Sequence, residues 1–230
     1  MKKITILTGA GISAESGIST FRDSNGLWEG HDVTEVASPQ GWNKNKELVL
    51  DFYNKRRAQL YNVEPNSAHL GLKQLEKTYE VKIITQNVDD LHERAGSSSI
   101  LHLHGELKKS RSTLDPTLIY NLNNEHINIG DKCEKGSQLR PHIVWFGEAV
   151  PAIEEAITIA KQSDIFIIIG TSLLVYPAAS LYQYIKPDIP IYLIDPNLDD
   201  LPEVSNPLIH YKEKASKGVE LLLKKLRITN

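Results

Sequence analysis

The 230-residue chain has a single cysteine, a single methionine and no long hydrophobic run. The lone cysteine, Cys133, excludes an intramolecular disulfide and favours a reducing compartment. The longest apolar run, residues 165–169, is far too short to span a membrane. The apolar stretch before Thr8-Gly9 comprises only residues 4–7. It is too short to be the hydrophobic region of a signal peptide. We therefore expect a cytoplasmic protein with no membrane partner.

The chain also lacks an excess of charge of either sign. Lys and Arg number 26 while Asp and Glu number 29, so the net charge is −3 at pH 7. This balance gives no electrostatic reason to expect a nucleic-acid partner. Hydrophobic residues make up 40% of the chain, enough for a sizeable core. The length favours one domain, alone or with a small insertion.

Short β-branched runs alternate with helical patterns along the chain. This alternation predicts an α/β fold, a Rossmann-like doubly wound parallel sheet with crossover helices. The strand runs are almost continuously apolar, as in strands that are covered on both faces. The expected strands are 4–7, 81–85, 100–103, 164–170 and 190–194. The expected helices are about 47–61, 67–79, 151–163, 177–186 and 216–226.

Residues 106–142 are polar and break the alternation. We expect them to form a small inserted module, with the Rossmann-like domain made of residues 1–105 and 143–230. The module would need a mini-core of its own, because a stable module must bury apolar side chains. Its apolar candidates are Leu114, Leu118, Ile119, Tyr120, Ile127 and Ile129.

Residues 8–28, TGAGISAESGISTFRDSNGLW, follow the first expected strand. Their segment 9–14 fits the pattern G-x-G-x-x-G/A, in which glycines let backbone N–H groups approach a pyrophosphate. A plain strand-to-helix turn is the alternative interpretation. A dehydrogenase would carry an acidic residue at the end of a second strand about 20 residues further on. No strand pattern occupies that region, so hydride transfer is disfavoured.

A second polar cluster, residues 85–96, follows the strand 81–85 and opens a helix. In open α/β sheets, ligands bind at the carboxyl ends of the strands. Asn87 can donate and accept hydrogen bonds, and Asp89 can accept one from an amide, which suits a nicotinamide carboxamide. The alternative is that Asp89 or Asp90 simply caps the next helix.

His102 and His104 occupy alternate positions in a third cluster, LHLHGE at 101–106. The alternation of a strand places both on one face, with the two leucines on the other. His104 stands at the strand end, where an imidazole that titrates near neutral pH can take a proton from a hydroxyl. The alternative for His104 is a hydrogen-bonded structural histidine, which is the role that we expect for His102.

In this order the motifs resemble those of the sirtuins, the Sir2 family of NAD-dependent protein lysine deacylases. The resemblance rests on GAGIS at 9–13 with Phe21-Arg22, QNVD at 86–89 and HG at 104–105. Later stretches agree with it, namely VWFGE at 144–148, GTS at 170–172 and VYP at 175–177. The resemblance implies that NAD is the cofactor and that acyl-lysine proteins or peptides are the substrates. In the family reaction the acyl group is transferred to ADP-ribose, and nicotinamide and free lysine are released.

The resemblance also implies roles for individual residues. The catalytic residues would be His104, as the general base, and Asn87. The wall of the acyl-lysine tunnel would be made by Ile143, Val144 and Phe146, and the substrate peptide would pair nearby as an added strand. The cofactor-binding residues would be Gly9, Ala10, Gly11, Ser13, Glu15, Gly17, Phe21, Arg22, Trp28, Gln86, Asn87, Val88, Asp89, Gly170, Thr171, Ser172, Asp195 and Ala215.

Tyr53 and Arg56 narrow the expected acyl group. They are i, i+3 neighbours on an expected helix, so both reach the same side. An arginine binds a carboxylate with two hydrogen bonds, and a phenol adds a third. The pair resembles the Tyr-x-x-Arg of class III sirtuins, which remove succinyl or malonyl groups, with acetyl removal also expected. The alternative is that the Lys-Arg-Arg run at 55–57 is a solvated helix face.

The chain departs from the family pattern in the inserted module and near the adenosine. Most sirtuins hold a structural zinc there with four cysteines, whereas this module has only Cys133, and Ser112 and the run 134–136 stand at other expected places. The spacing of His126, Asp131 and Glu134 around Cys133 is poor for a tetrahedral site, so we expect a metal-free module. Leu193 replaces an asparagine that often touches the adenosine ribose, and Asp195 is the expected substitute.

Two other functions are compatible with the same cofactor site. One is a mono-ADP-ribosyltransferase that uses another acceptor. The other is a non-catalytic NAD-binding sensor, which is disfavoured because His104, Asn87 and Asp89 are all present. We expect the protein to be a monomer.

Overall fold

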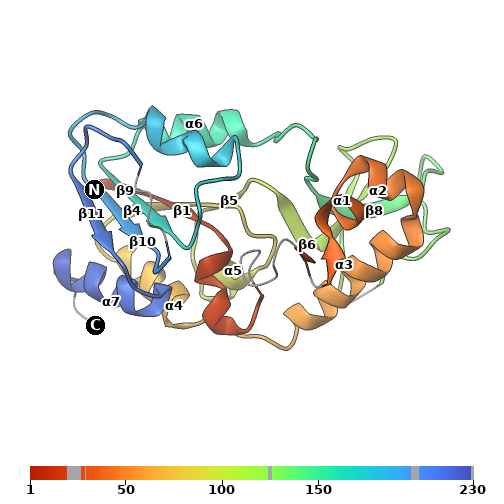
Figure 1. Cartoon of the computed structure of the whole chain (residues 1–230), viewed down its shortest axis with the longest axis horizontal. Helices are drawn as coiled ribbons and strands as arrows, with labels where there is room; N and C mark the ends of the chain where they lie inside the picture. The colour runs from red at the N-terminus through yellow and green to blue at the C-terminus, as the bar shows by residue number, and fades with distance from the viewer. Residues whose placement is uncertain (20–26, 29, 124–125, 198–201, 229–230) are drawn as a thin grey trace.

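The computed structural model describes residues 1–19, 27–28, 30–123, 126–197 and 202–228. A six-stranded parallel sheet of order β11-β10-β9-β1-β4-β5 forms one end of the molecule (Figure 1). This order confirms the predicted Rossmann-like, doubly wound α/β fold. The strands are β1 Lys3–Thr8, β4 Glu80–Thr85, β5 Ile100–His102, β9 Ile165–Ile169, β10 Ile191–Ile194 and β11 Leu208–Tyr211.

The two faces of this sheet are both buried, as the continuous apolar runs predict. On one face, Ile6 and Ile83 pack in a core with α4 (Ser67–Leu75) and α7 (Ala215–Lys225). On the other face, Leu7 and Ile84 pack in a core with α6 (Ile153–Lys161) and the 3-10 helix Ala178–Tyr184. Figure 1 shows α6 above the sheet and α4 and α7 below it. Adjacent residues of one strand therefore pack in the cores on opposite faces of the sheet.

The ends of three central strands lie level with one another. Thr8 of β1 pairs with Thr85 of β4 on one side and with Ile169 of β9 on the other. The chain runs outward from β1 to β4 and β5 and then crosses back to β9, so the strand order reverses between β1 and β9. In open α/β sheets this reversal is where ligands bind, beyond the carboxyl ends of the strands.

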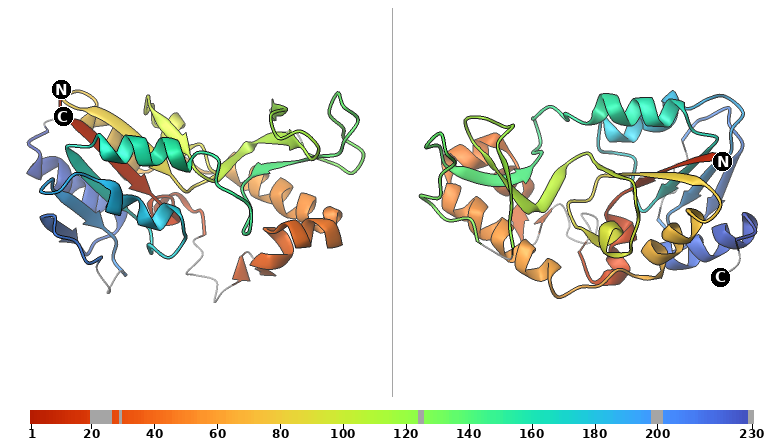
Figure 2. Two further views of the ribbon diagram at one scale, coloured as in Figure 1. Left: turned by 90° about the horizontal axis from the view of Figure 1, so that it is seen from above. Right: turned by 180° about the vertical axis from the view of Figure 1, so that it is seen from behind.

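A second group of elements lies at the far end of the molecule from the parallel sheet (Figures 1 and 2). It contains an antiparallel sheet of order β7-β6-β8 and the short pair β2-β3. A separate core joins this sheet to the helices before it in the chain, through Leu107, Ile143 and Val49. The elements are β2 Leu27–Trp28, β3 His31–Asp32, α1 Val33–Val36, α2 Pro39–Lys44, α3 Lys46–Leu60, β6 Gly105–Ser112, β7 Ile119–Asn121 and β8 Leu139–Ile143, and the short α5 Leu91–Arg94 lies beside the parallel sheet.

The prediction of a mini-core within residues 106–142 is wrong for three of its six residues, because they are exposed. Leu114, Ile119 and Ile129 are 67%, 44% and 52% exposed. Ile127, another predicted member, is buried, but in a core shared with α3, because a sheet of three strands gains more by packing on a helix than by closing on itself. The boundaries of the inserted module at 106 and 142 stay a prediction.

Four of the five predicted helices are α-helices within a few residues of their expected bounds. The fifth, expected at 177–186, is the 3-10 helix Ala178–Tyr184. No helix in the described ranges is both long and apolar enough to cross a membrane.

Candidate active site

A cavity of about 780 Å³ opens beyond the carboxyl ends of β1, β4, β9 and β10 and reaches α3 and the segment after β8. It lies at the reversal of strand order, where an α/β sheet is expected to bind its ligand. Predicted site residues that line it are Gly9, Ala10, Gly11, Ser13, Glu15, Tyr53, Arg56, Gln86, Asn87, Val88, Asp89, His104, Ile143, Val144, Phe146, Gly170, Thr171, Ser172, Asp195 and Ala215.

The glycine-rich loop after β1 packs backbone to backbone on the loop after β9. Gly11 donates its N–H to the carbonyl of Gly170 across 2.8 Å. A Cβ on Gly11 would lie 2.6 Å from the Gly170 Cα. A Cβ on Gly170, which has a φ of +62°, would lie 2.4 Å from the Ile12 nitrogen. Close approach therefore requires glycine at both positions, and the positive φ adds a conformational reason at Gly170.

Ser13 joins the glycine-rich loop to the loop after β4. Its hydroxyl donates to Asp89 across 2.9 Å and accepts from the Asn87 side-chain amide across 3.1 Å. Asp89 is 7% exposed, and burial raises the pKa of its carboxyl group. The other Asp89 oxygen accepts from the Leu91 N–H at the start of α5. Asp89 therefore accepts from the first residue of α5, whose N-cap is Asp90, and also lines the cavity.

His104 presents a basic nitrogen to the cavity. Its Nδ1 lies 3.0 Å from the Gln86 carbonyl oxygen, which can only accept. Nδ1 therefore carries the proton, and the lone pair is on Nε2. Burial lowers the pKa of His104, although the bond to Gln86 opposes this change. The neutral imidazole that a general base requires is thus favoured near neutral pH.

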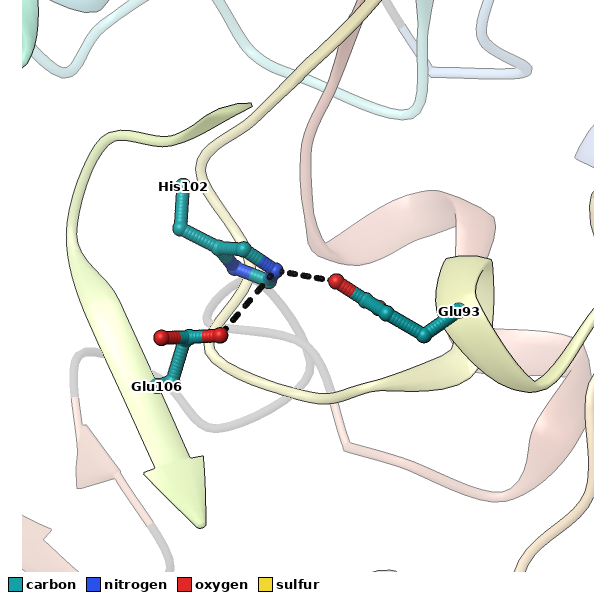
Figure 3. Close-up of side chains that lie close together, drawn as sticks. All are labelled: Glu93, His102 and Glu106. Atoms are coloured by element: carbon teal, nitrogen blue, oxygen red, sulfur yellow. Dashed lines mark hydrogen bonds and ion pairs between the residues drawn. The ribbon is translucent and has the colours of Figure 1, made fainter. Parts of the chain in front are cut away.

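His102 is not among the residues that line the cavity, as expected of a structural histidine. Its Nδ1 lies 3.1 Å from the Asn87 carbonyl oxygen, and its Nε2 lies 2.7 Å from Glu93 and 3.9 Å from Glu106 (Figure 3). Burial favours the neutral ring, but the hydrogen bond to Glu93 and the charges of both glutamates raise the pKa of His102. Among the described residues, these three bring ligand atoms within 4.8 Å of one another, but both His102 ring nitrogens face hydrogen-bond acceptors, which suits N–H donors rather than a metal ligand.

The Lys-Arg-Arg run on α3 divides into three environments. Lys55 is exposed and pairs with Asp51 across 2.7 Å. Arg57 is buried and donates to the Leu107 carbonyl and to Asn54. Arg56 is 8% exposed and lines the cavity. The alternative of a solvated face is therefore correct for Lys55 and wrong for Arg56 and Arg57.

Tyr53 lines the cavity one helical turn before Arg56 and is fully buried. Its hydroxyl oxygen accepts a hydrogen bond from the Trp145 indole across 3.1 Å. Burial raises the pKa of Tyr53, so the phenol stays protonated. Trp145 is itself held by Glu148, which accepts from its backbone N–H, and by Arg140, whose guanidinium stacks on its ring at 3.3 Å.

The loops after β9 and β10 close the other end of the cavity. Thr171 accepts a hydrogen bond from the Gln86 side-chain amide across 3.1 Å. Glu15 accepts from the Ser216 N–H in the first turn of α7, which anchors the glycine-rich loop. Asp195 lines the cavity, whereas Leu193 is fully buried in a sheet core. Lys214, just before α7, also lines the cavity and was missed, since a lysine before a helix carries no ligand signal in the sequence.

Some predicted cofactor residues do not reach the described cavity wall. Gly17 ends a 3-10 turn with a φ of +94° and is not among the lining residues. Its glycine identity is explained by that left-handed conformation. Trp28 contributes backbone to β2, and its side chain is not described. Phe21 and Arg22 lie outside the described residues.

Cys133 lies in a hydrogen-bonded cluster with two serines at the far end of the module. Its sulfur is 3.4 Å from the Ser112 hydroxyl and 3.2 Å from the Ser137 hydroxyl, and the two hydroxyls are 2.8 Å apart. Of the alternative ligands, Asp131 accepts from the Asn128 N–H, and Glu134 accepts from the Tyr120 hydroxyl. A metal-free module stays a prediction.

A doubly wound parallel sheet with a cavity at its strand reversal, walled by glycine-rich backbone, defines a nucleotide-binding α/β protein. The model of the Sir2 family matches residues 9–177. The chain therefore belongs to the Sir2 family.

Individual relatives support this assignment over most of the chain. A protein of Helicobacter pylori described as an NAD-dependent protein deacylase is 65% identical over 196 residues, which are 85% of each chain. One of Bacteroides thetaiotaomicron with the same description is 53% identical over 227 residues, 96% of this chain and 97% of that one. The crystal structure of a Sir2 homologue in complex with NAD superposes with a TM-score of 0.85 at 38% identity, covering 98% of this chain and 90% of that chain.

Proposed function

We propose that this protein removes succinyl or malonyl groups, and also acetyl groups, from protein lysines, transferring them to ADP-ribose and releasing nicotinamide. Membership of the Sir2 family makes the general reaction an NAD-dependent protein deacylation. The observation that carries the acyl preference is the position of Arg56. This guanidinium lines the same cavity as His104 and Asn87 and is 8% exposed.

The residues of the cavity fit NAD. The close packing of Gly11 on Gly170 leaves backbone, with no Cβ, at the place where a diphosphate would lie. Asn87 and Asp89 supply an amide and a carboxyl group, held by Ser13, that suit a carboxamide. When bound, NAD supplies the ribose carbon that receives the acyl oxygen, and nicotinamide as the leaving group.

The protein's own groups provide a base and a dry environment. His104 Nε2 carries the lone pair and lines the cavity, so it takes a proton from a hydroxyl bound there. Ile143 and Trp145, 3% and 2% exposed, exclude water from the wall beside it. A water-poor wall strengthens the fixed hydrogen bonds that stabilise charge in the transition state.

The acyl preference follows from the charge and hydrogen-bonding groups that Tyr53 and Arg56 of α3 present to the cavity. A carboxylate at the end of an acyl chain offers Arg56 two charge-assisted hydrogen bonds and a neutral methyl offers none. Tyr53 stays protonated because burial raises its pKa, so its hydroxyl can donate to the same carboxylate. Hydrogen bonds to a charged group contribute about 1.5–3 kcal/mol, which corresponds to about 10- to 100-fold in rate.

The test compares wild type with Arg56→Met on one peptide carrying acetyl-, succinyl- or malonyl-lysine. Arg56→Met is expected to lose most desuccinylation and demalonylation while deacetylation stays within a few-fold. Lys55→Met is the matched control, since Lys55 is the exposed neighbour on the same helix. Equal acetyl, succinyl and malonyl rates in both enzymes would remove the acyl preference from the proposal.

His104→Ala separates the deacylase from its alternatives. Loss of about 100- to 10,000-fold in turnover with NAD binding retained is expected of a missing general base. Retained nicotinamide release without lysine release would favour an ADP-ribosyltransferase, and NAD binding by a wild type that shows no turnover would favour a sensor.

A further inference from the structure

Three successive carbonyls of the loop after β4 accept hydrogen bonds from β5, from β6 and from the segment between them. The Gln86 oxygen accepts from His104, the Asn87 oxygen from His102, and the Val88 oxygen from the Leu107 N–H at 2.8 Å. The bond to the Asn87 oxygen is made by the side chain of His102, which does not line the cavity. His102 thus contacts the backbone of Asn87, a residue that lines the cavity, without lining the cavity itself.

We propose that His102 is a positioning residue that acts as an imidazolium, clamped by Glu93 and Glu106, to hold the Asn87 backbone in register with the cavity. This inference rests on the proposed role of Asn87 in the nicotinamide site.

The geometry requires two protons on the ring. Nδ1 faces the Asn87 carbonyl, which can only accept, and Nε2 faces the Glu93 carboxylate at 2.7 Å, with Glu106 at 3.9 Å (Figure 3). A neutral imidazole has one N–H and satisfies only one of these acceptors, whereas an imidazolium satisfies both. The side chain is 10% exposed, so water is a poor substitute for either partner.

The charges around His102 come from each element packed against it. Glu93 lies on α5 and Glu106 on β6, where Lys109 also pairs with Glu106. Burial raises the pKa of Asp89 and the charge of His102 opposes that change, while burial lowers the pKa of His92 and the charge of His102 adds to that change. Two glutamates therefore face one imidazolium, and one of them shares its charge with a lysine.

Asn87 is consequently fixed at three points. Its N–H donates to the Thr85 hydroxyl at 3.0 Å, its carbonyl accepts from His102, and its side-chain amide donates to Ser13. When His102 loses a proton, its remaining N–H goes to the stronger acceptor, the Glu93 carboxylate. The Asn87 carbonyl then loses its partner, and the residue is held at two points instead of three.

The two histidines need opposite protonation states, which predicts a bell-shaped pH profile. His104 must be neutral to act as a base, and burial lowers its pKa. His102 must be charged, and its glutamates raise its pKa. Activity is expected to rise with pH as His104 loses its proton and to fall at higher pH as His102 loses its proton.

The test measures the pH dependence of kcat/KM in wild type, Glu93→Gln and Glu106→Gln. Removing an opposite charge next to His102 is expected to move the alkaline limb down by about one pH unit for Glu93→Gln, and by less for the more distant Glu106→Gln. The acid limb, which belongs to His104, should not move. Glu154→Gln, an exposed glutamate on α6, is the matched control.

Two further measurements separate this role from simple folding effects. His102→Gln is expected to lower kcat about tenfold, with the peptide KM unchanged and the alkaline limb abolished. Nitrogen NMR shifts of the wild-type His102 ring, which need no turnover, should report an imidazolium at pH 7. A neutral His102 at pH 7, or an alkaline limb that stays in place in both glutamate variants, would overturn the proposal without touching the proposed deacylase function.

Discussion

Trp145 donates its indole N–H to the Tyr53 hydroxyl oxygen across 3.1 Å, although the two residues are 92 positions apart in the chain. Tyr53 is fully buried and Trp145 is 2% exposed. This bond ties the segment after β8, which lines the cavity, to α3, the helix that carries Arg56. Arg140 stacks on the Trp145 ring, and Glu148 accepts a hydrogen bond from the Trp145 backbone N–H. The Tyr53 phenol is therefore oriented by a chain of contacts as well as by its own rotamer.

Tyr53→Phe is expected to lower desuccinylation about tenfold and to leave deacetylation nearly unchanged, because one hydrogen bond to a charged acyl group is worth about 1.5–3 kcal/mol. The variant also leaves the Trp145 indole without its partner, so the free energy of unfolding should fall by about 1–3 kcal/mol. Steady-state kinetics on both peptides and urea unfolding check the two effects. An equal loss on both acyl groups would mean that the phenol acts only through packing.

Gly11→Ala tests the backbone cradle of the glycine-rich loop. Its Cβ would lie 2.6 Å from the Gly170 Cα, so the loops must separate, and we expect a large rise in the KM for NAD. Overpacking of this kind also costs about 1–3 kcal/mol of stability.

The control for Gly11→Ala is Gly71→Ala on α4. Its Cβ would lie 2.6 Å from a Val219 side-chain carbon, away from the cavity. The control should lose stability while its KM for NAD stays the same. If both variants lose stability and both show a higher KM for NAD, the effect of Gly11→Ala comes from lost stability and not from a specific role of the glycine-rich loop in NAD binding.

Stability should fall as the pH falls from 6.5 towards 4. Burial lowers the pKa of His69 from 6.5 to about 4, and the Asn66 N–H occupies its Nδ1. The unfolded chain binds this proton first, so the folded state loses stability as pH falls through that window. One pKa unit corresponds to about 1.4 kcal/mol, so this histidine alone contributes a loss of about 2–3 kcal/mol. Urea midpoints at several pH values, compared with those of His69→Gln, measure it; equal slopes in both proteins would contradict it.

The inserted module should hold its structure without a metal ion. The Cys133 thiol lies within 3.4 Å of the Ser112 and Ser137 hydroxyls, and a structural zinc needs four ligands. Chelator treatment is therefore expected to leave the melting temperature unchanged, and elemental analysis of tag-free protein should find no stoichiometric zinc. One zinc per chain would contradict this prediction.

The parallel sheet could be predicted because its strands carry local signals. The runs at 4–7, 81–85 and 165–169 are short and apolar and are punctuated by glycine or polar residues, so their number and spacing define the fold class. The packing of 106–142 could not be predicted, because the partner of Ile127 is α3, more than 60 residues earlier in the chain. Local periodicity carries no information about such a contact.

The site shows the same division between local motif and distant partner. The pattern at 9–14 predicts a tight loop, but the need for glycine at Gly11 comes from Gly170. That residue follows β9, a strand that pairs with β1 only in the folded sheet. Arg56 and Arg57 are adjacent and identical in type, yet one lines the cavity and the other bonds the Leu107 carbonyl. The two arginines differ only in the direction in which the helix points their side chains. The sequence predicts that direction only to within about one residue.

The most direct test of the central claim offers the wild-type enzyme an equimolar mixture of acetyl- and succinyl-peptides of one sequence, with and without NAD. Mass spectrometry of the loss of the two acyl-peptides, which differ in mass, gives the ratio of the two kcat/KM values in a single reaction. The position of Arg56 predicts a ratio that favours succinyl, that depends wholly on NAD, and that falls about 10- to 100-fold in Arg56→Met. A ratio that favours acetyl and is unchanged in Arg56→Met would contradict the account.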